Sequence, residues 1–185
     1  QFNPSHNMFT TAPAFARLHL KKKSKVLDLC CGDGSSSYLF FSDISERVDA
    51  VDINKSALEY AKRVFKKSNI SFIESEISDY LTNCPTVYDL YYMGSAFDYF
   101  SKKQRSNIFY LIQNQMSYSS IFVLKTPLWT KEIYSRNTQV NVGAQLDYAD
   151  SESAINVELK SYFTTVTTYV VEYGERTEII ATCWR

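Results

Sequence analysis

The residues best suited to chemistry lie in the stretch VLDLCCGDGS at residues 26–35, which joins an apolar run to a helical pattern. Gly32 and Gly34 allow the backbone to turn sharply and to approach a ligand without an intervening Cβ. The helix that follows directs its free N–H groups toward whatever binds in the turn. Asp52 ends the next apolar run, twenty residues after Gly32, and a carboxylate there can accept hydrogen bonds from both hydroxyls of a ribose. These residues predict a site for an adenosine-type nucleoside.

Two other interpretations of the glycine turn stay open. The dinucleotide fingerprint G-x-G-x-x-G needs a third small residue for close packing of helix on strand, and Ser37 stands at that position. An NAD(P) site is disfavoured by this mismatch but not eliminated. A G-x-G pair is weak evidence when taken alone, so an ordinary turn without a ligand is the second alternative.

The elements that must position this turn alternate along the chain. Strand-like and helix-like segments follow one another, which predicts a mainly parallel sheet with crossover helices. Two β-rich runs at the end of the chain, separated by GER, predict an antiparallel hairpin. The expected strands are residues 25–29, 47–53, 70–74, 88–93, 120–125, 164–173 and 177–184. The expected helices are residues 35–42, 56–67, 77–82, 102–116 and 151–163.

Composition and charge narrow the class of protein. A chain of 185 residues favours one domain, residues 1–185. Lys plus Arg and Asp plus Glu both total 20, so the basic excess of a typical nucleic-acid binder is missing. The four cysteines show neither metal-ligand spacing nor a disulfide framework, which favours a reducing compartment. No apolar run has the length of a membrane span or the form of a signal peptide. We therefore expect a soluble cytoplasmic protein without metal, membrane or nucleic-acid partner, and Gln1 leaves open whether the native start lies upstream.

The stretch VLDLCCGDGS, followed by VDAVDIN, resembles motif I and the next acidic motif of class I S-adenosylmethionine-dependent methyltransferases. The sequence departs from the family at Cys30, where the family has its first glycine. The resemblance continues through FIESEISDYL and YDLYYMGSAFDYF, over roughly the first two-thirds of the chain, and the terminal hairpin resembles the family's antiparallel last strand. It implies a Rossmann-like three-layer α/β sandwich with a mainly parallel seven-stranded sheet, an antiparallel last strand and S-adenosylmethionine as cofactor. Residues 1–24 would form an N-terminal cover, and residues 126–150 a variable loop over the substrate side.

The resemblance also implies which residues bind the cofactor. Asp52 would bind the ribose, and Ile53 would pack on the adenine face. Glu76 would accept a hydrogen bond from the adenine amine and Ile77 would offer its backbone N–H to the ring, although a solvated loop acid is an alternative for Glu76. The methionine end would lie against Asp28 and the backbone of Cys30, Gly32 and Gly34, with Met93 and Gly94 under the sulfonium, just past the fourth strand.

Methyl transfer requires a nucleophile aligned with the methyl group, exclusion of water and, for a hydroxyl or ammonium acceptor, a base. Asp98 is the leading candidate base because it follows the fourth strand, where substrate and cofactor meet in this family. The alternative is that Asp98 caps the helix beginning near Ser101. His19 in the N-terminal helix is the second candidate, with a packing role as its alternative. Candidate aromatic residues for the pocket, where a ring face would attract a sulfonium, are Phe9, Tyr92, Tyr99 and Trp129.

These features favour transfer of a methyl group to an oxygen or nitrogen atom of a small-molecule or sugar-like acceptor. After the fourth strand, MGSA stands where N6-adenine methyltransferases have a D/N-P-P-Y/F tetrapeptide, which argues against nucleic-acid bases as acceptors. Two alternatives remain at this stage. One is a non-catalytic module that binds the cofactor or a protein partner, and the other is an NAD(P)-linked oxidoreductase on a similar fold. The sequence predicts neither the acceptor nor the oligomeric state.

Overall fold

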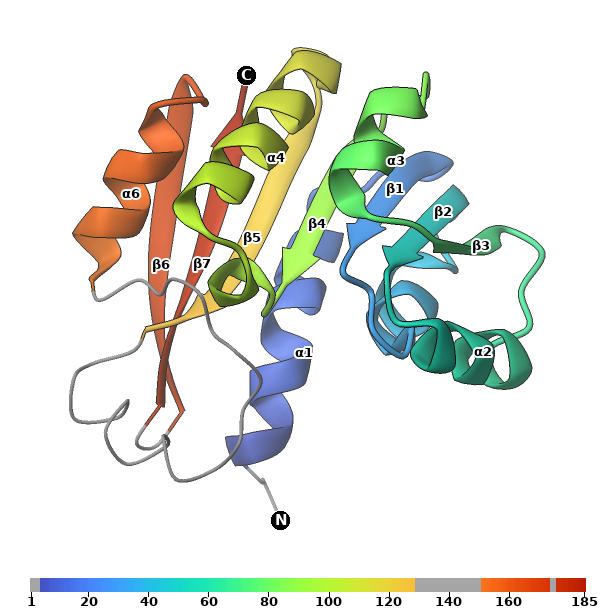
Figure 1. Cartoon of the computed structure of the whole chain (residues 1–185). Coiled ribbons are helices and arrows are strands. Elements are labelled where there is room, and N and C mark those ends of the chain that lie inside the picture. Colours follow the sequence, from blue (N-terminus) through green and yellow to red (C-terminus); the bar gives the residue numbers. More distant parts are fainter. Residues whose placement is uncertain (1–3, 129–150, 174–175) are drawn as a thin grey trace.

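The computed structural model describes residues 4–128, 151–173 and 176–185. They form a three-layer α/β sandwich around a seven-stranded sheet with the order β3-β2-β1-β4-β5-β7-β6 (Figure 1). The strands are β1 (Ser24–Leu29), β2 (Ser45–Asp52), β3 (Ile70–Glu74), β4 (Leu90–Gly94), β5 (Ile121–Pro127), β6 (Thr165–Tyr173) and β7 (Arg176–Trp184). The helical segments are α1 (Pro4–Arg17), η1 (Ser37–Phe41), α2 (Lys55–Val64), α3 (Ile77–Asn83), η2 (Phe97–Tyr99), α4 (Lys102–Gln115) and α6 (Glu152–Lys160). The expected fold class is confirmed.

The sheet brings the ends of the parallel strands to one edge. β1 pairs in parallel with both β2 and β4, whereas β7 is antiparallel to both β5 and β6. The chain moves outward from β1 to β2 and β3 and then returns to β4 on the other side of β1, so the strand order reverses at β1 and β4. Ligands of open α/β sheets bind at such a switch point, beyond the carboxyl ends of the strands.

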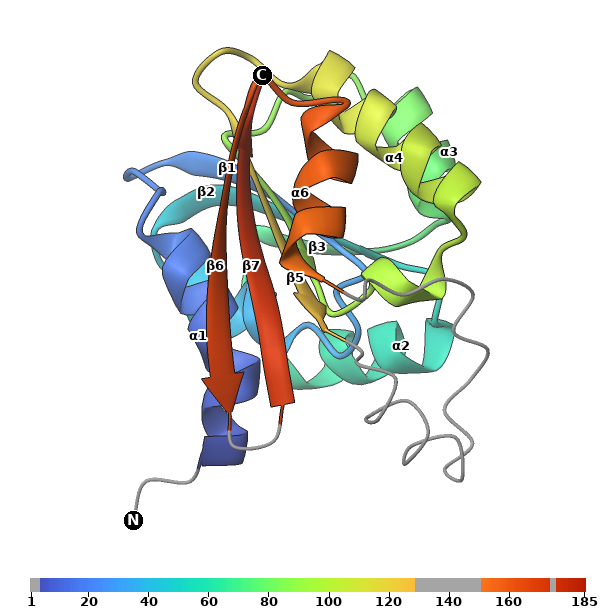
Figure 2. The ribbon, with the colours of Figure 1, turned by 90° about the vertical axis from the view of Figure 1, so that its left-hand side faces the viewer.

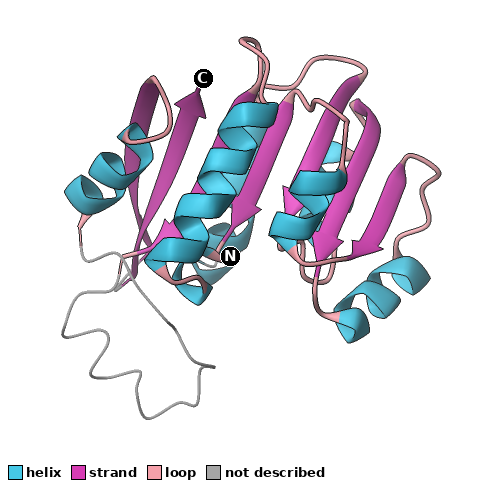
Figure 3. Ribbon diagram, turned by 45° about the horizontal axis from the view of Figure 1, so that its top comes forward, coloured by secondary structure: helices cyan, strands magenta, loops and turns pink. Residues whose placement is uncertain are grey.

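Apolar side chains lie on both faces of the sheet, and helices pack on each face, so the central strands are buried on both sides. Leu27, Met93 and Phe122 pack with α3, α4 and α6 on one face. Tyr92 and Val123, their neighbours along the chain, pack with α1 on the opposite face. Figure 2 shows α1 on one side of the sheet and α3, α4 and α6 on the other, and Figure 3 shows helices packed in a layer against the strands.

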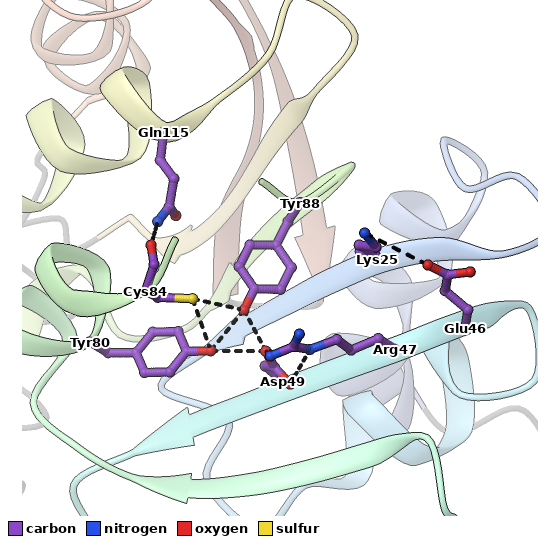
Figure 4. A network of polar contacts seen from close by, with 8 residues as sticks. All are labelled: Lys25, Glu46, Arg47, Asp49, Tyr80, Cys84, Tyr88 and Gln115. Atoms are coloured by element: carbon purple, nitrogen blue, oxygen red, sulfur yellow. Dashed lines mark hydrogen bonds and ion pairs between the residues drawn. The ribbon is translucent and has the colours of Figure 1, made fainter. Parts of the chain in front are cut away.

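A buried polar network joins β2 to α3 and to the segment before β4 (Figure 4). Asp49 of β2 is fully buried, and Arg47 Nη2 lies 2.7 Å from its Oδ2. The hydroxyls of Tyr80 and Tyr88 both donate to the same carboxylate, the first at 2.9 Å. Cys84 Sγ lies 3.4 Å from the Tyr88 hydroxyl oxygen. A buried carboxylate requires this degree of hydrogen bonding, so the network is a structural feature of the core.

Several expected boundaries move. The helix expected at residues 35–42 contains the short π-helical segment η1, and the expected loop begins later because Thr126 and Pro127 belong to β5. Residues 129–150 of that loop lie outside the described residues, as do residues 1–3 of the expected cover. Ser24, the last residue of that cover, already opens β1. Within the described ranges, no helix has both the length and the apolar character needed to cross a membrane.

Candidate active site at the carboxyl edge of the sheet

The turn after β1 has a left-handed backbone at Cys30, Gly32 and Gly34, with φ values of 56°, 55° and 76°. A Cβ on Gly34 would lie 2.4 Å from Cε1 of Phe72, so packing as well as backbone conformation requires glycine there. A Cβ on Gly32 would meet no atom within 4 Å. The turn is therefore closely packed at Gly34 and open at Gly32, where a ligand can approach the backbone.

Asp52, the last residue of β2, is held by this turn. Its Oδ2 accepts a hydrogen bond from the Gly32 N–H at 2.8 Å, and its Oδ1 accepts one from the Asn54 N–H at 2.8 Å. Each carboxylate oxygen keeps a second lone pair, so both can accept a further hydrogen bond from a ligand. Ile53, the next residue, has 73% of its side chain exposed. The structure thus brings Gly32, Asp52 and Ile53 together.

Asp28 lies under the turn with 1% of its surface exposed. The Ser37 hydroxyl donates to its Oδ2 at 2.5 Å, which links β1 to η1. Burial raises the pKa of Asp28 to about 7; the Ser37 hydrogen bond opposes this shift, and the charges of Asp52 and Asp33 add to it. Tyr92 is the β4 partner of Asp28 in the strand register.

Glu76 has a role that neither sequence interpretation anticipated. Its Oε2 accepts hydrogen bonds from the N–H groups of Ser78, at 2.6 Å, and Asp79, at 3.2 Å, so it is the N-cap of α3. The side chain of Ile77 is buried, and no hydrogen bond within the described residues uses its backbone N–H. Glu76 is therefore an exposed acid, as one interpretation expected, and it also caps the helix N-terminus.

Met93 and Gly94 are the last residues of β4 and do not lie past it. The Met93 side chain points into the core on the α4 face, so only its backbone reaches the edge. A Cβ on Gly94 would lie 2.7 Å from the Tyr92 hydroxyl oxygen. The glycine is therefore needed to make room for that hydroxyl at the end of β4.

The structure separates the two candidate bases. Asp98 lies buried in η2, beyond the end of β4. It does not cap the next helix, because Ser101 does so in a capping box with Gln104. The ring of His19 contacts Trp184 at a centroid distance of 6.3 Å. Because β7 is antiparallel, Trp184 lies at the amino ends of the parallel strands, so the structure does not bring His19 to the edge that holds Asp52.

The aromatic candidates also lie in different surroundings. Tyr92 is buried, whereas Phe9 and Tyr99 are largely exposed. The Phe9 ring centroid lies 5.7 Å from Lys125 Nζ, which places this part of α1 over the end of β5. Trp129 lies outside the described residues.

The sequence interpretation missed an ion pair at this edge. Lys125 Nζ of β5 lies 3.1 Å from Glu178 Oε2 of β7, and the two side chains are only 4% and 5% exposed. Burial raises the pKa of Glu178, although the Lys125 charge opposes the shift. The only trace of this pair in the sequence is one charged residue in each of two apolar expected strands, Lys125 in one and Glu178 in the other. The sequence does not show that these two strands are neighbours.

The comparison with protein families agrees with this geometry. Residues 26–116 match a family model described as a methyltransferase domain. This range starts in β1 and ends after α4, so it contains the glycine turn, Asp52 and Gly94. No curated protein sequence matches the chain.

Solved structures share the fold over almost the whole chain. The N-methyltransferase NodS from Bradyrhizobium japonicum WM9 has a TM-score of 0.74 at 16% identity, covering 99% of this chain and 97% of NodS. NodS in complex with S-adenosyl-L-homocysteine gives 0.75 at 15% identity, covering 99% and 88%. The PH0226 protein from Pyrococcus horikoshii OT3 gives 0.74 at 18% identity, covering 98% and 91%. At these identities the structures show a common fold.

Fold, turn and family match together define a Rossmann-like nucleoside-binding enzyme of the methyltransferase type. The chain is a class I S-adenosylmethionine-dependent methyltransferase, and S-adenosylmethionine is its cofactor. The family match decides among the alternatives that the sequence left open, against the NAD(P)-linked oxidoreductase and the non-catalytic module. The residues at the edge fit the cofactor, because the turn is open at Gly32 and Asp52 keeps free lone pairs.

Proposed function

We propose that this enzyme transfers the methyl group to an oxygen or nitrogen atom of a small-molecule, sugar-like acceptor. The observation that carries the proposal is the acidic character of the carboxyl edge, where Asp52 ends β2 and Glu76 precedes α3 without a basic partner among the described residues. Such an edge attracts a cationic cofactor and repels a polyphosphate chain. The formal net charge of zero also lacks the basic surplus of a nucleic-acid enzyme.

The cofactor would bind across the ends of β1, β2 and β4. In this arrangement Asp52 accepts hydrogen bonds from the ribose, Ile53 packs on the adenine, and the Ile77 N–H donates to the ring. Glu76 caps α3 through one carboxylate oxygen, and its second oxygen would accept a hydrogen bond from the adenine amine. The methionine end would follow the Gly32 turn above Asp28 toward Gly94, with Cys30, Gly34 and the Met93 backbone shaping the path.

The bound cofactor supplies an electrophilic methyl group on a positively charged sulfur. The protein has to hold the acceptor atom in line with that methyl group and keep water out. Asp98 lies at the correct edge for a base, and His19 lies at the opposite edge, so Asp98 is kept in the proposal and His19 is not. NodS, which has the same fold, is an N-methyltransferase, which supports nitrogen as one type of acceptor atom.

Calorimetric titration tests the cofactor part of the proposal. We expect saturable binding of S-adenosylmethionine and of S-adenosyl-L-homocysteine, and no binding of NAD or NADP. Transfer of a tritiated methyl group to a panel of amino sugars, small amines, phenols and oligonucleotides then tests the acceptor class. Labelling of oligonucleotides in preference to every small molecule would contradict the proposal.

A further inference from the structure

Three polar side chains from neighbouring strands lie on the α1 face at the carboxyl edge: Tyr92 of β4, Lys125 of β5 and Glu178 of β7. Their position follows from strand alternation, because Val123 and Ile180, two residues away from Lys125 and Glu178, pack against α1 together with Tyr92. Lys125 pairs with Gly94 on one side and with Ile180 on the other. Lys125 therefore lies between the end of β4 and the start of β7, in a diagonal row from Tyr92, which pairs with Val123, to Glu178, which pairs with Pro127.

The ion pair in this row is costly for the fold. Both Lys125 and Glu178 are almost completely buried, and Nζ lies 3.1 Å from Oε2. Removing two charges from water costs several kcal/mol per ion, and a well-packed apolar pair is often at least as stable. Because burial raises the pKa of Glu178 despite the neighbouring ammonium, its carboxylate binds a proton more readily than an exposed one. The pair is therefore better suited to a chemical role than to a stabilising one.

The Tyr92 hydroxyl lies close to this ion pair. The side chain is only 3% exposed, and the hydrogen bonds of the described residues do not include its hydroxyl. The hydroxyl oxygen is not one of the fully enclosed polar atoms without a partner among the described residues, so a ligand at this edge can reach it. The hydroxyl lies directly above Gly94, and the charges of Asp28 and Glu178 add to burial in raising its pKa. It stays protonated at the end of β4 and is available to a ligand atom that binds there.

We propose that Tyr92 and Glu178 face the methyl acceptor, and that Glu178 takes the proton from its attacking O–H or N–H group. This assignment rests on the proposed function and deepens it by requiring an acceptor atom that carries a proton. The Tyr92 hydroxyl orients that atom by a hydrogen bond. A lone pair on the atom forms the bond to the methyl carbon, the S–C bond breaks with its electron pair remaining on sulfur, and the proton moves to the Glu178 carboxylate. Lys125 is a positioning residue that keeps Glu178 ionised until then.

The proposal can be tested without knowing the acceptor. Sinefungin is a cofactor analogue with a C–NH3+ group in place of S–CH3, so its ammonium group lies where the acceptor meets the methyl group. We expect Glu178→Gln to weaken sinefungin binding by about tenfold or more and Tyr92→Phe to weaken it severalfold, since a hydrogen bond to a charged group contributes about 1.5–3 kcal/mol. S-adenosyl-L-homocysteine, which lacks this ammonium group, should bind both variants as it binds the wild type. The exposed Glu172 of β6 provides the matched control, and Glu172→Gln should change neither affinity.

The positioning role of Lys125 has its own measurement. The preference for sinefungin over S-adenosyl-L-homocysteine should rise with pH as Glu178 ionises. Lys125→Met should move that rise to higher pH, because an ammonium group no longer favours the ionised carboxylate. If Glu178→Gln fails to fold, the double variant Lys125→Met/Glu178→Met replaces the pair with apolar side chains of similar length and should still lose the preference.

The two proposals fail in different ways. If the wild type does not bind S-adenosyl-L-homocysteine, the proposed function itself is overturned. Normal binding of S-adenosyl-L-homocysteine, with an unchanged sinefungin preference in both Tyr92→Phe and Glu178→Gln, would overturn only the assignment of the acceptor-facing residues.

Discussion

Oδ2 of Asp52 lies 2.8 Å from the backbone nitrogen of Gly32, across the two neighbouring strand ends. This contact fixes the carboxylate at the carboxyl edge of the sheet and leaves lone pairs on both of its oxygens. Preorganisation of this kind reduces the ordering cost of binding. The contact therefore joins the open glycine turn and the acidic residue into one binding surface.

Asp52→Ala should weaken binding of S-adenosylmethionine by about 10- to 100-fold, since it removes hydrogen bonds to a charged group. Asp98→Ala should have a much smaller effect on the same affinity, because Asp98 lies beyond β4 in η2. Calorimetric titration of both variants measures the difference, with Glu59→Gln on the exposed face of α2 as a charge-matched control. Equal losses for Asp52→Ala and Asp98→Ala would show that the cofactor site has been assigned incorrectly.

The two glycines of the turn should respond differently to alanine. Gly34→Ala forces a Cβ to within 2.4 Å of the Phe72 ring and should lower the free energy of unfolding by about 2–4 kcal/mol. Gly32→Ala adds a methyl group to open space and should cost only about 1–2 kcal/mol through its backbone conformation. Its main effect should be on cofactor affinity. Urea denaturation and calorimetry separate these outcomes, and a folded, stable Gly34→Ala variant would contradict the packing argument.

Much of the fold follows from local patterns, whereas the surroundings of several site residues depend on long-range contacts. The alternation of segments predicts the strands and the terminal hairpin, because burial and turn formation leave traces within short windows. The offset between Gly32 and Asp52 is likewise visible, since both follow parallel strands. The capping role of Glu76, the core position of Met93 and the Lys125–Glu178 pair depend on which elements become neighbours in space. The position of His19 could not be predicted for a related reason, because a helix position does not show at which edge of the sheet the helix ends.

Cys30→Gly should stabilise the protein. Cys30 occupies the position of the family's first glycine and has φ of 56°, a conformation that costs a residue with a Cβ about 1–2 kcal/mol. Glycine removes this cost but loses about 0.5–1 kcal/mol through the entropy of the unfolded chain. We expect a net gain of up to about 1 kcal/mol in the free energy of unfolding, measured with urea. Cys30→Ala keeps the Cβ and serves as the control; an equal gain in that variant would assign the effect to the thiol.

Tyr88→Phe should destabilise the core without affecting cofactor binding. The Tyr88 hydroxyl donates to the buried carboxylate of Asp49, and a hydrogen bond to a charged group contributes about 1.5–3 kcal/mol. Tyr91→Phe is the matched control, because the Tyr91 hydroxyl accepts only from the Tyr88 N–H, at 3.3 Å. Urea denaturation should show the larger loss for Tyr88→Phe, whereas titration with S-adenosyl-L-homocysteine should give the wild-type affinity for both. A change in that affinity would link the network to the active site.

The stability of the protein should depend on pH through Asp28. Its pKa is raised from 3.8 to about 7 in the folded state by burial. Between these values the folded protein holds a proton that the unfolded chain has already released, so this carboxyl group lowers the free energy of unfolding as pH rises from about 4 to about 7. Asp28→Asn removes the titration and keeps an oxygen that accepts from Ser37. The variant should therefore gain stability relative to the wild type as pH rises.

Urea denaturation at a series of pH values from about 4.5 to 8 measures this difference directly. The two unfolding free energies should diverge up to about pH 7 and then run parallel, because above that pH both the folded and the unfolded wild type carry the ionised group. Asp33→Asn removes an exposed carboxylate from the same turn, which contributes least to the raised pKa of Asp28, and should give a much smaller divergence. Binding of S-adenosylmethionine brings positive charge toward Asp28, which favours its ionised form. The affinity of the wild type should therefore rise with pH toward 7, and Asp28→Asn should abolish that rise. If wild type and Asp28→Asn instead show the same pH dependence in both unfolding and binding, Asp28 is already ionised in the folded protein at lower pH.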